Sequence, residues 1–446
     1  MNAQAVRRKF SLPPILSSQR NGMTIYGVPR PELPLISIHL ILPFGAEADP
    51  PGKAGLADLT AEMLTLGTRH RTAAQIAAEV DSLGATLSAR AGWHATSLHV
   101  QGLKEDLDRL LGMLREIVSE PSFSEEEFAQ LRQRRVAMLV QQKDESSIVV
   151  RERFEQILFR ETPYDHPIYG ALHSLPRLSR DEAQEFYTQR FLPQGSFWVF
   201  VGDLDPDECF HRVEALFPRA TDGTIPSPPF HPRIISGIKT VLVDRPDLTQ
   251  SQICLGHLGI PPVHPDVFAF EVMNYILGGG GFSSRLMRRI RVERGYTYGV
   301  RSSLDLRKNL GSFSITTFTP TETTSRCVQE IFSVVKSFLA EGANPEERSE
   351  AIHFLTGSYP LKFETLSQVA QRIIQTEVLG LGIEYLEEYP GKISAVGQEE
   401  MIRCAQKNVH PDDVVLAVVG RAEAFRRDFE RWGPVEVWNE PAGSEP

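Results

Sequence analysis

The hydrophobic positions of the chain follow patterns that predict strands and helices in alternation. The apolar run "LISIHLIL" predicts a strand. In the segment "GLADLTAEMLTLGT", Leu56, Leu59, Met63 and Leu66 recur at three- and four-residue steps, which predicts an amphipathic helix. Gly67 stands where a glycine commonly ends a helix.

Two carboxylates lie on the flank of this predicted helix. Asp58 and Glu62 are four residues apart, so their side chains share one side of the helix. Two acidic groups so placed could hold a metal ion or exchange protons. The helix is therefore a candidate catalytic element.

The order of predicted elements repeats along the chain. The second half offers the strand "SQICLGHLGI" and the helix "VFAFEVMNYI", and both halves continue with amphipathic helices and close on a strand and a helix. The offset of about 210–220 residues is far longer than a solenoid repeat. We predict two homologous domains, 1–225 and 226–446, joined by the proline-rich segment 221–237. No Rossmann fingerprint accompanies the alternation, which disfavours a nucleotide-binding fold.

Composition and charge narrow the class of protein. The 446 residues are 41% hydrophobic and 23% charged, as in ordinary globular domains. A net charge of -10 argues against a nucleic-acid or anionic-membrane binder. The four cysteines are scattered, and no run of 18 apolar residues occurs. The sequence as written predicts a soluble cytoplasmic protein, or a periplasmic one if a signal peptide has been removed.

Several segments together resemble the inverzincin peptidases, the group that contains pitrilysin, insulysin and the mitochondrial processing peptidase. The matching segments include "NGMTIYGVPRPELPLISIHLILPFGAEADPPGKAGLADLTAEMLTLGT", "PYDHPIYG" and "LGGGGFSSRLMRRIRVERGYTYGV". The resemblance implies an α+β fold of the LuxS and processing-peptidase type. In that fold two domains, each a mostly antiparallel sheet packed with helices, enclose a chamber for an unfolded peptide.

The zinc motif of that family is degraded here. Active members carry H-x-x-E-H, in which two histidines bind zinc and the glutamate acts as general base. The matching positions are Asp58 to Glu62, with Ala61 in place of the base. The third ligand aligns with Met138 or Leu139, and none of the twelve histidines forms a comparable motif. We therefore predict no zinc site in this chain and interpret the helix as a degenerate catalytic helix.

A residual role for Asp58 and Glu62 remains open. Hard cations prefer oxygen ligands, but they generally need more than two carboxylates from one helical turn. The simpler interpretation is that both residues are solvated or hydrogen-bonded on the helix flank.

The second half retains a different part of the family pattern. Arg291 falls on the last turn of the helix predicted after "FSS", and Tyr298 follows at the start of a strand. These positions match the family's substrate-binding arginine and tyrosine. A guanidinium can bind peptide carbonyls, and a phenol can donate to a developing oxyanion. Alternatively, Arg291 belongs to a solvated arginine-rich face and Tyr298 to the core.

Two other motifs have less chemical content. The glycine run in "LGGGGFSSRL" resembles a phosphate cradle, but it lacks the lysine of a nucleotide-binding loop. It more plausibly permits hinging or close approach of a peptide. His166 and His173 in and beside "PYDHPIYG" are interpreted as residues of ordered loops.

The resemblance implies a substrate-binding subunit of a two-chain peptidase. In such a pair, an H-x-x-E-H paralogue supplies the zinc, and this chain supplies Arg291 and Tyr298 to bind an unfolded peptide. The alternative is a non-enzymatic, homodimeric peptide-binding or scaffold protein, similar to the core subunits of respiratory complexes. In neither case is the chain expected to be catalytic alone.

Overall fold

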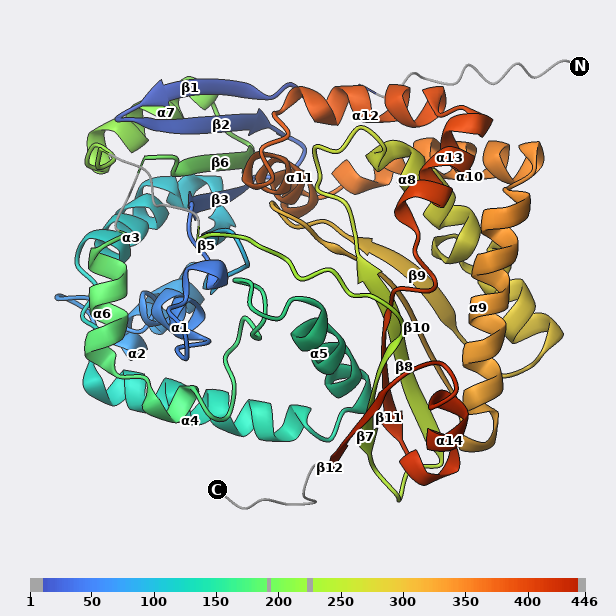
Figure 1. Cartoon of the computed structure of the whole chain (residues 1–446). Coiled ribbons are helices and arrows are strands. Elements are labelled where there is room, and N and C mark those ends of the chain that lie inside the picture. The colour runs from blue at the N-terminus through green and yellow to red at the C-terminus, as the bar shows by residue number, and fades with distance from the viewer. Residues whose placement is uncertain (1–10, 191–193, 223–227, 440–446) are drawn as a thin grey trace, which may run out of the picture. The chain divides into compact units, whose positions relative to one another are not determined.

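The computed structural model describes residues 11–190, 194–222 and 228–439 (Figure 1). The predicted domain boundary at 225/226 lies outside these residues, as does part of the predicted linker. Contacts divide the chain into two compact units. The first comprises Met1–Gln133, Ser174–Ser227 and Thr356–Gly391, and the second comprises Arg134–His173, Pro228–Leu355 and Lys392–Pro446.

The first unit is built on a six-stranded sheet of order β1-β2-β6-β3-β5-β4. All neighbouring strands are antiparallel except β2 and β6. The strands are β1 (Leu16–Arg20), β2 (Met23–Pro29), β3 (Leu35–Leu42), β4 (Thr86–Ala91), β5 (Thr96–Leu103) and β6 (Phe197–Gly202). The central strands β3 and β6 are almost wholly buried, which explains their continuous apolar sequence.

Helices cover both faces of this sheet. On one face lie α3 (Leu107–Ser119), which presents an apolar stripe at helical spacing, and α7 (Pro206–Leu216). α11 (Leu366–Val378) packs against β6 and β3 on the opposite face. The unit also contains α1 (Leu56–Met63), α2 (Ala73–Ser82) and α6 (Arg180–Thr188). α4 (Glu125–Gln142) and α12 (Glu384–Ala395) each contain a boundary between the units.

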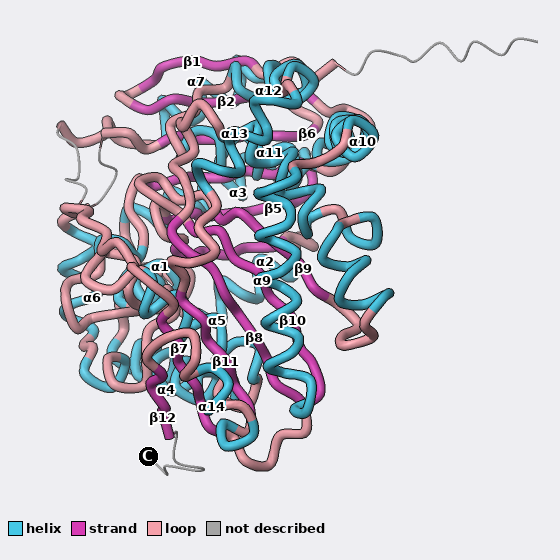
Figure 2. Tube along the Cα trace, turned by 45° about the vertical axis from the view of Figure 1, so that its right-hand side comes forward, coloured by secondary structure: helices cyan, strands magenta, loops and turns pink. Residues whose placement is uncertain are grey.

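The second unit repeats this plan with the sheet order β12-β7-β11-β8-β10-β9. The pairs β12–β7 and β7–β11 are parallel, and the others are antiparallel. Figure 2 shows β8, β10 and β11 running side by side. The strands are β7 (Lys239–Asp244), β8 (Gln250–Leu258), β9 (Val300–Asp305), β10 (Ser312–Pro320), β11 (Val415–Gly420) and β12 (Val435–Asn439).

A helix from the first half of the sequence completes the second unit. α5 (Ser146–Leu158) packs on β8 and β11, and Figure 1 shows it on the side of the sheet opposite α9 (Thr324–Glu341). The first half of the sequence thus contributes α5 to the second unit, and the second half contributes α11 to the first unit. The remaining helices are α8 (Val267–Asn274), α10 (Pro345–Gly357), α13 (Gln398–Asn408) and α14 (Arg426–Phe429).

The predicted α+β architecture with two sheets packed by helices is therefore confirmed. Some local predictions need adjustment. α1 ends at Met63, before the predicted terminator Gly67. Three successive i→i+3 bonds tighten the chain after α1, and Gly67, at φ +129°, then forms a bridge with Thr72. Within the described segments, every helix is too short or too polar to cross a bilayer.

Candidate functional site

Helix α1 is held in the first unit by carboxylates. Asp49 accepts hydrogen bonds from the backbone N–H groups of Gly55 and Ala57, each at 2.7 Å, and so satisfies the helix N-terminus. Burial raises the pKa of Asp49 to about 7, although the two N–H donors oppose this shift. Asp49 is therefore partly protonated near neutral pH.

The two carboxylates that the sequence singled out are both engaged. Asp58 is fully buried, and its Oδ1 accepts the backbone N–H of Ala91 on edge strand β4 at 3.3 Å. Glu62 forms an ion pair with Arg90, also on β4. These contacts tie α1 to the edge strand. The sequence predicted that Asp58 would be either solvated or hydrogen-bonded. In the structure it is buried and hydrogen-bonded.

The residues at the family's zinc positions do not fit a zinc ion. Ala61 is buried and has no donor atom, and Glu62 is neutralised by Arg90. Among the described residues, no group of three or more His, Cys, Asp or Glu side chains could hold a metal. Zinc sites in proteins use three or four such donors, so α1 lacks the chemistry of a metallopeptidase centre.

The structure brings together a histidine pair that the sequence pattern did not indicate. His39 on β3 stacks on His99 on β5, with ring centroids 4.2 Å apart, and Ser37 Oγ lies 3.1 Å from Nε2 of each ring. Burial, together with the neighbouring His99, lowers the pKa of His39 to about 3, and burial also lowers the pKa of His99. Both rings are therefore neutral at physiological pH. Only the pairing of β3 with β5 reveals this cluster, since the residues are 60 positions apart.

Three further histidines have other surroundings. His94, five residues before His99 in the sequence, bonds to Glu47 through Nδ1 at 2.8 Å. His166 contacts the carbonyl of Pro167 within its loop, and His173 is exposed. The interpretation of His166 and His173 as loop residues agrees with their positions outside helices and strands.

In the second unit, Arg291 and Tyr298 are adjacent. Arg291 lies in a π-helical segment, Met287–Glu293, and its Nη1 donates to the carbonyl oxygen of Tyr298 at 2.8 Å. Its guanidinium also lies over the ring of Phe282, 4.5 Å from the centroid. Phe282 ends the glycine run and is 69% exposed. The sequence pattern did not predict that Phe282 would join this pair.

Three arginines near Arg291 in the sequence form ion pairs with carboxylates, whereas Arg288 is exposed. Arg285 pairs with Glu347, and Arg289 and Arg294 both pair with Glu330. Over the described ranges, Arg291 has no carboxylate partner, so its charge is not neutralised by an ion pair. It is half-buried, so it does not simply belong to a solvated arginine face.

Tyr298 is presented on a fixed backbone. Thr297 Oγ1 accepts the N–H of Gly299 at 3.0 Å, and Thr317 Oγ1 donates to the Gly299 carbonyl at 2.8 Å. The Tyr298 side chain is nevertheless 79% exposed, which excludes the alternative that it belongs to the core. It precedes β9 by two residues. A constrained loop with an exposed phenol can donate a hydrogen bond to a ligand at little entropic cost.

The glycine run brings a helix end against β9. α8 continues as a π-helical turn, Tyr275–Gly279, and a Cβ atom at Gly278 would lie 2.6 Å from the amide nitrogen of Ser302. Any side chain at Gly278 would push the turn away from the strand. Gly278 therefore permits a close approach of the turn to β9, whereas from the sequence we expected hinging or the approach of a peptide.

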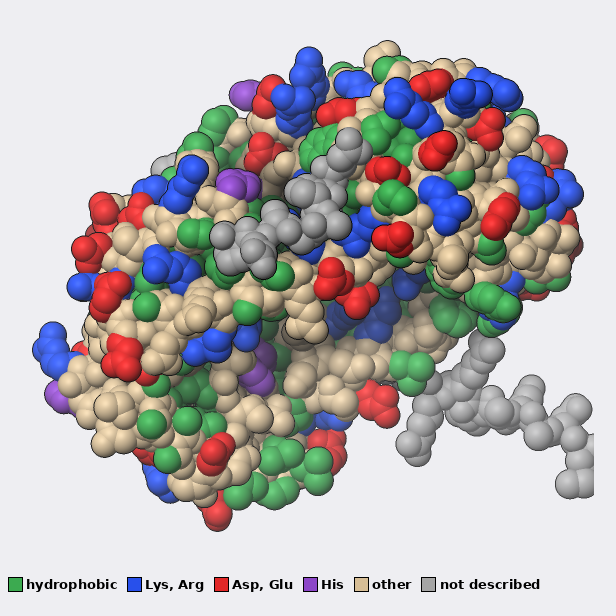
Figure 3. All heavy atoms as spheres, turned by 90° about the horizontal axis from the view of Figure 1, so that it is seen from below, with side chains coloured by type: hydrophobic (Ala, Val, Ile, Leu, Met, Phe, Trp, Pro, Cys, Tyr) green, Lys and Arg blue, Asp and Glu red, His purple; other side chains and the backbone are tan. Residues whose placement is uncertain are grey.

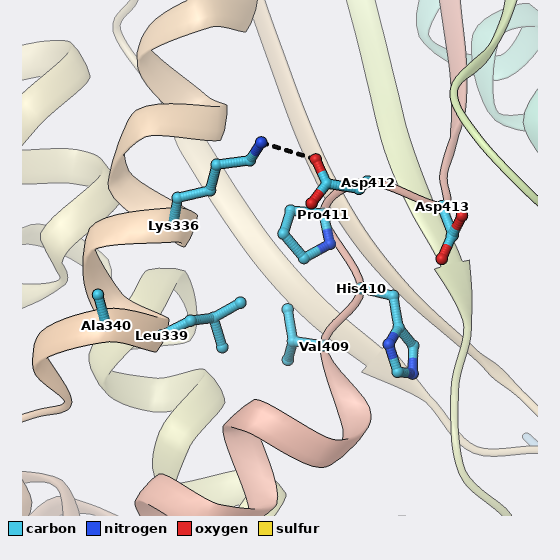
Figure 4. Close-up of a pocket in the computed structure, with 8 residues that line it drawn as sticks. All are labelled: Lys336, Leu339, Ala340, Val409, His410, Pro411, Asp412 and Asp413. Atoms are coloured by element: carbon cyan, nitrogen blue, oxygen red, sulfur yellow. Dashed lines mark hydrogen bonds and ion pairs between the residues drawn. The ribbon is translucent and has the colours of Figure 1, made fainter.

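A cavity of about 750 Å³ adjoins this glycine segment within the second unit. Its lining comes from α5, the strands β8, β9 and β10, the glycine run and Phe354. A second hollow of about 470 Å³ lies between α9 and the loop before β11 (Figure 4). There Lys336 and Asp412 form an ion pair at 2.6 Å, and Asp413 accepts the backbone N–H of Gly237 at 2.8 Å.

The surface charge gives no sign of a nucleic-acid interface on the face shown in Figure 3. Basic and acidic side chains are interspersed there. A nucleic-acid-binding face would gather basic side chains into a patch or stripe.

Comparison with known protein families gives two matches that follow one another along the chain. The profile described as "Insulinase (Peptidase family M16)" matches residues 31–172. The profile described as "Peptidase M16 inactive domain" matches residues 177–355. Together they cover α1 and the Arg291–Tyr298 segment.

Individual relatives agree with these profiles. The chain is 26% identical over 390 residues to the "Non-peptidase homolog YmxG" of Helicobacter pylori, covering 87% of this chain and 89% of the relative. It is 28% identical over 336 residues to an "Uncharacterized zinc protease" of Rickettsia bellii, covering 75% of this chain and 80% of the relative.

Solved structures share the fold. A peptidase M16 inactive domain from Pseudomonas fluorescens superposes with a TM-score of 0.83 at 24% identity, covering 91% of this chain and 98% of that one. A protease from Helicobacter pylori superposes with a TM-score of 0.84 at 18% identity, covering 92% and 100%.

Proposed function

The chain belongs to the M16, or insulinase, family of peptidases, and within that family we propose that it is the substrate-binding subunit of a two-chain peptidase. Its partner would be a paralogue that carries H-x-x-E-H and the zinc ion. This chain would contribute Arg291 and Tyr298 to the binding of an unfolded peptide. The zinc would activate water in the partner, because the residues of α1 cannot hold the metal.

The observation that carries the proposal is the pairing of an exposed tyrosine with an arginine that has no carboxylate partner in residues 11–190, 194–222 and 228–439. Arg291 is oriented by the Tyr298 carbonyl and by the ring of Phe282. Its other N–H donors can bind a peptide carbonyl or a newly formed carboxylate. Groups held in position before the ligand binds lose less entropy on binding.

The test is reconstitution of the chain with its H-x-x-E-H paralogue and measurement of cleavage of an unfolded peptide. We expect no cleavage by either chain alone and cleavage by the mixture. Tyr298→Phe removes one hydroxyl donor and should lower turnover by roughly 10²-fold if that donor meets the oxyanion. Arg291→Lys keeps the charge but loses the planar donor geometry, so it should also lower turnover.

Matched controls separate this role from a general loss of structure. Tyr169→Phe alters another exposed tyrosine of the second unit, and Arg403→Ala alters an exposed arginine on α13. Both should leave turnover unchanged, and all four variants should still co-purify with the partner. Cleavage by the chain alone that EDTA abolishes would refute the proposal.

A second candidate function is non-enzymatic peptide binding or a scaffold role as a homodimer. It is favoured by the name of the Helicobacter pylori relative, a non-peptidase homologue. In that case Arg291→Lys would weaken peptide binding by the chain alone, and no paralogue would confer cleavage. The reconstitution experiment therefore distinguishes the two functions.

A further inference from the structure

The cavity beside the glycine segment contains one arginine whose charge is not balanced. Arg301 lies on β9, opposite Thr316 of β10, and is exposed. Within the described part of the chain, the side chain of Arg301 forms no hydrogen bond or ion pair. Strand alternation places its side chain on the same sheet face as Asp305, four residues further along the strand.

Two acidic groups of the second unit, Asp305 on β9 and Glu155 on α5, pair with other arginines. Asp305 accepts from Arg307 Nε at 2.9 Å, and Glu155 on α5 accepts from Arg307 Nη2 at 2.7 Å. Glu155 also pairs with Arg151, which lines the cavity, at 3.0 Å. This chain of two carboxylates and two guanidinium groups is electrically balanced, so Arg301 leaves the cavity with an excess positive charge.

The rest of the cavity wall is apolar and could contact an apolar group that lies beside the negatively charged group of a ligand. Val150, Phe318 and Phe354 contribute apolar surface, and Phe354 is 55% exposed. A volume of about 750 Å³ is large enough for two or three amino-acid side chains. A free inorganic anion would use Arg301 but would leave this apolar surface uncovered.

We infer that this cavity is a specificity subsite for an acidic side chain that neighbours a large apolar residue in a bound peptide, with Arg301 as the recognising group. The inference rests on the proposed function for its substrate class, but it concerns a different group of residues. Arg301 has no part in the Arg291–Tyr298 cluster. It adds a charge preference to the peptide binding of this chain.

The test measures peptide binding to the full chain by calorimetry, without the paralogue. Two extended peptides of equal length are compared. They differ only in the residue before a phenylalanine, which is Glu in one peptide and Gln in the other. The Glu peptide should bind about five-fold more tightly, because an exposed charge-assisted hydrogen bond adds a modest increment. The preference should shrink in high salt, since Arg301 is exposed.

Variants assign the preference to one residue. Arg301→Gln should abolish the difference between the two peptides, Arg301→Lys should retain part of it, and the control Arg403→Gln should leave it unchanged. Equal binding of both peptides to the unaltered chain, no binding of either, or a preference that survives Arg301→Gln would each overturn the inference.

A competition arm separates a peptide carboxylate from a free anion. Sodium glutamate or phosphate at matched ionic strength should not displace the Glu peptide at concentrations near that peptide's Kd. Displacement at such concentrations would mean that the cavity takes a small anion, which would also overturn the inference. None of these outcomes bears on turnover by the reconstituted pair, so failure here leaves the proposed function standing.

Discussion

Arg307 is the residue whose replacement should most clearly loosen the second unit. It is only 3% exposed, yet it carries a full charge that two carboxylates neutralise, Glu155 on α5 and Asp305 on β9. Its guanidinium also lies over the rings of Phe159 and Tyr164, at 4.4 and 5.3 Å from their centroids. This one side chain therefore links α5 to the sheet of the other half of the sequence.

Arg307→Met keeps the aliphatic volume but removes the cation partner of Asp305 and one of the two cation partners of Glu155, which keeps Arg151. Breaking a buried ion pair by removing one partner costs about 3–5 kcal/mol. Asp305 is about one-third exposed on its side chain, at 35%, so water offsets part of its loss. We therefore expect the substitution to lower the free energy needed to open α5 by about 3 kcal/mol, the lower end of this range.

Hydrogen exchange measured by mass spectrometry on peptides covering 146–158 reports that opening directly. A loss of about 3 kcal/mol corresponds to roughly 100-fold faster exchange of the slowest α5 amides. Combining Arg307→Met with Asp305→Asn removes the unpaired carboxylate, while Glu155 keeps its ion pair with Arg151, so exchange should slow again. Arg403→Met serves as the surface control. A double variant that exchanges faster than the single variant would refute the argument from unbalanced charge.

Two further predictions concern stability. The pKa of His39 is lowered to about 3 in the folded chain, so the unfolded chain binds more protons than the folded chain below about pH 6.5. His39 should therefore make the free energy of unfolding fall by about 2 kcal/mol from pH 8 to pH 5. Asp49, with its pKa raised to about 7, has the opposite sign, because the folded chain gains a proton on acidification. In urea unfolding, His39→Gln and Asp49→Asn should thus change the pH 8 to 5 difference in opposite directions, and a shift in the same direction would contradict both assignments. Gly278→Ala should destabilise by about 1–3 kcal/mol through its clash with Ser302, whereas Gly357→Ala, in a helix and with open space at its Cβ, should be neutral or stabilising by thermal unfolding.

The local pattern of hydrophobic residues predicted the helices and strands in which that pattern is most regular. The strand "LISIHLIL" is β3 to the residue, and α1 and α8 begin within the segments that the sequence assigned to helices. Arg291 stands on the last helical turn as predicted. These features depend on side chains a few positions apart, which one sequence contains in full.

Pairings between distant segments could not be read from that pattern. α5 follows the helices of the first half but packs on the second sheet, held there by Arg307, which is 152 residues from Glu155. The His39–His99 stack likewise depends on the register of β3 against β5. The π-helical turn Tyr275–Gly279 arises where Gly278 lets the chain meet β9 closely, a tertiary contact that local propensity does not encode.

The two units differ in how their polar groups are used. On α1 of the first unit, Asp58 bonds to Ala91 and Glu62 pairs with Arg90, so both carboxylates serve to attach the helix to the sheet. In the second unit, Arg291 lacks a carboxylate among the described residues, and the phenol of Tyr298 lies open to solvent. A polar group that is satisfied within the fold would lose a bond by turning to a ligand, whereas one that is held in place but still solvated gains a bond on binding. Ligand recognition by this chain should therefore depend on the second unit, and substitutions at Asp58 or Glu62 should affect stability before they affect peptide binding.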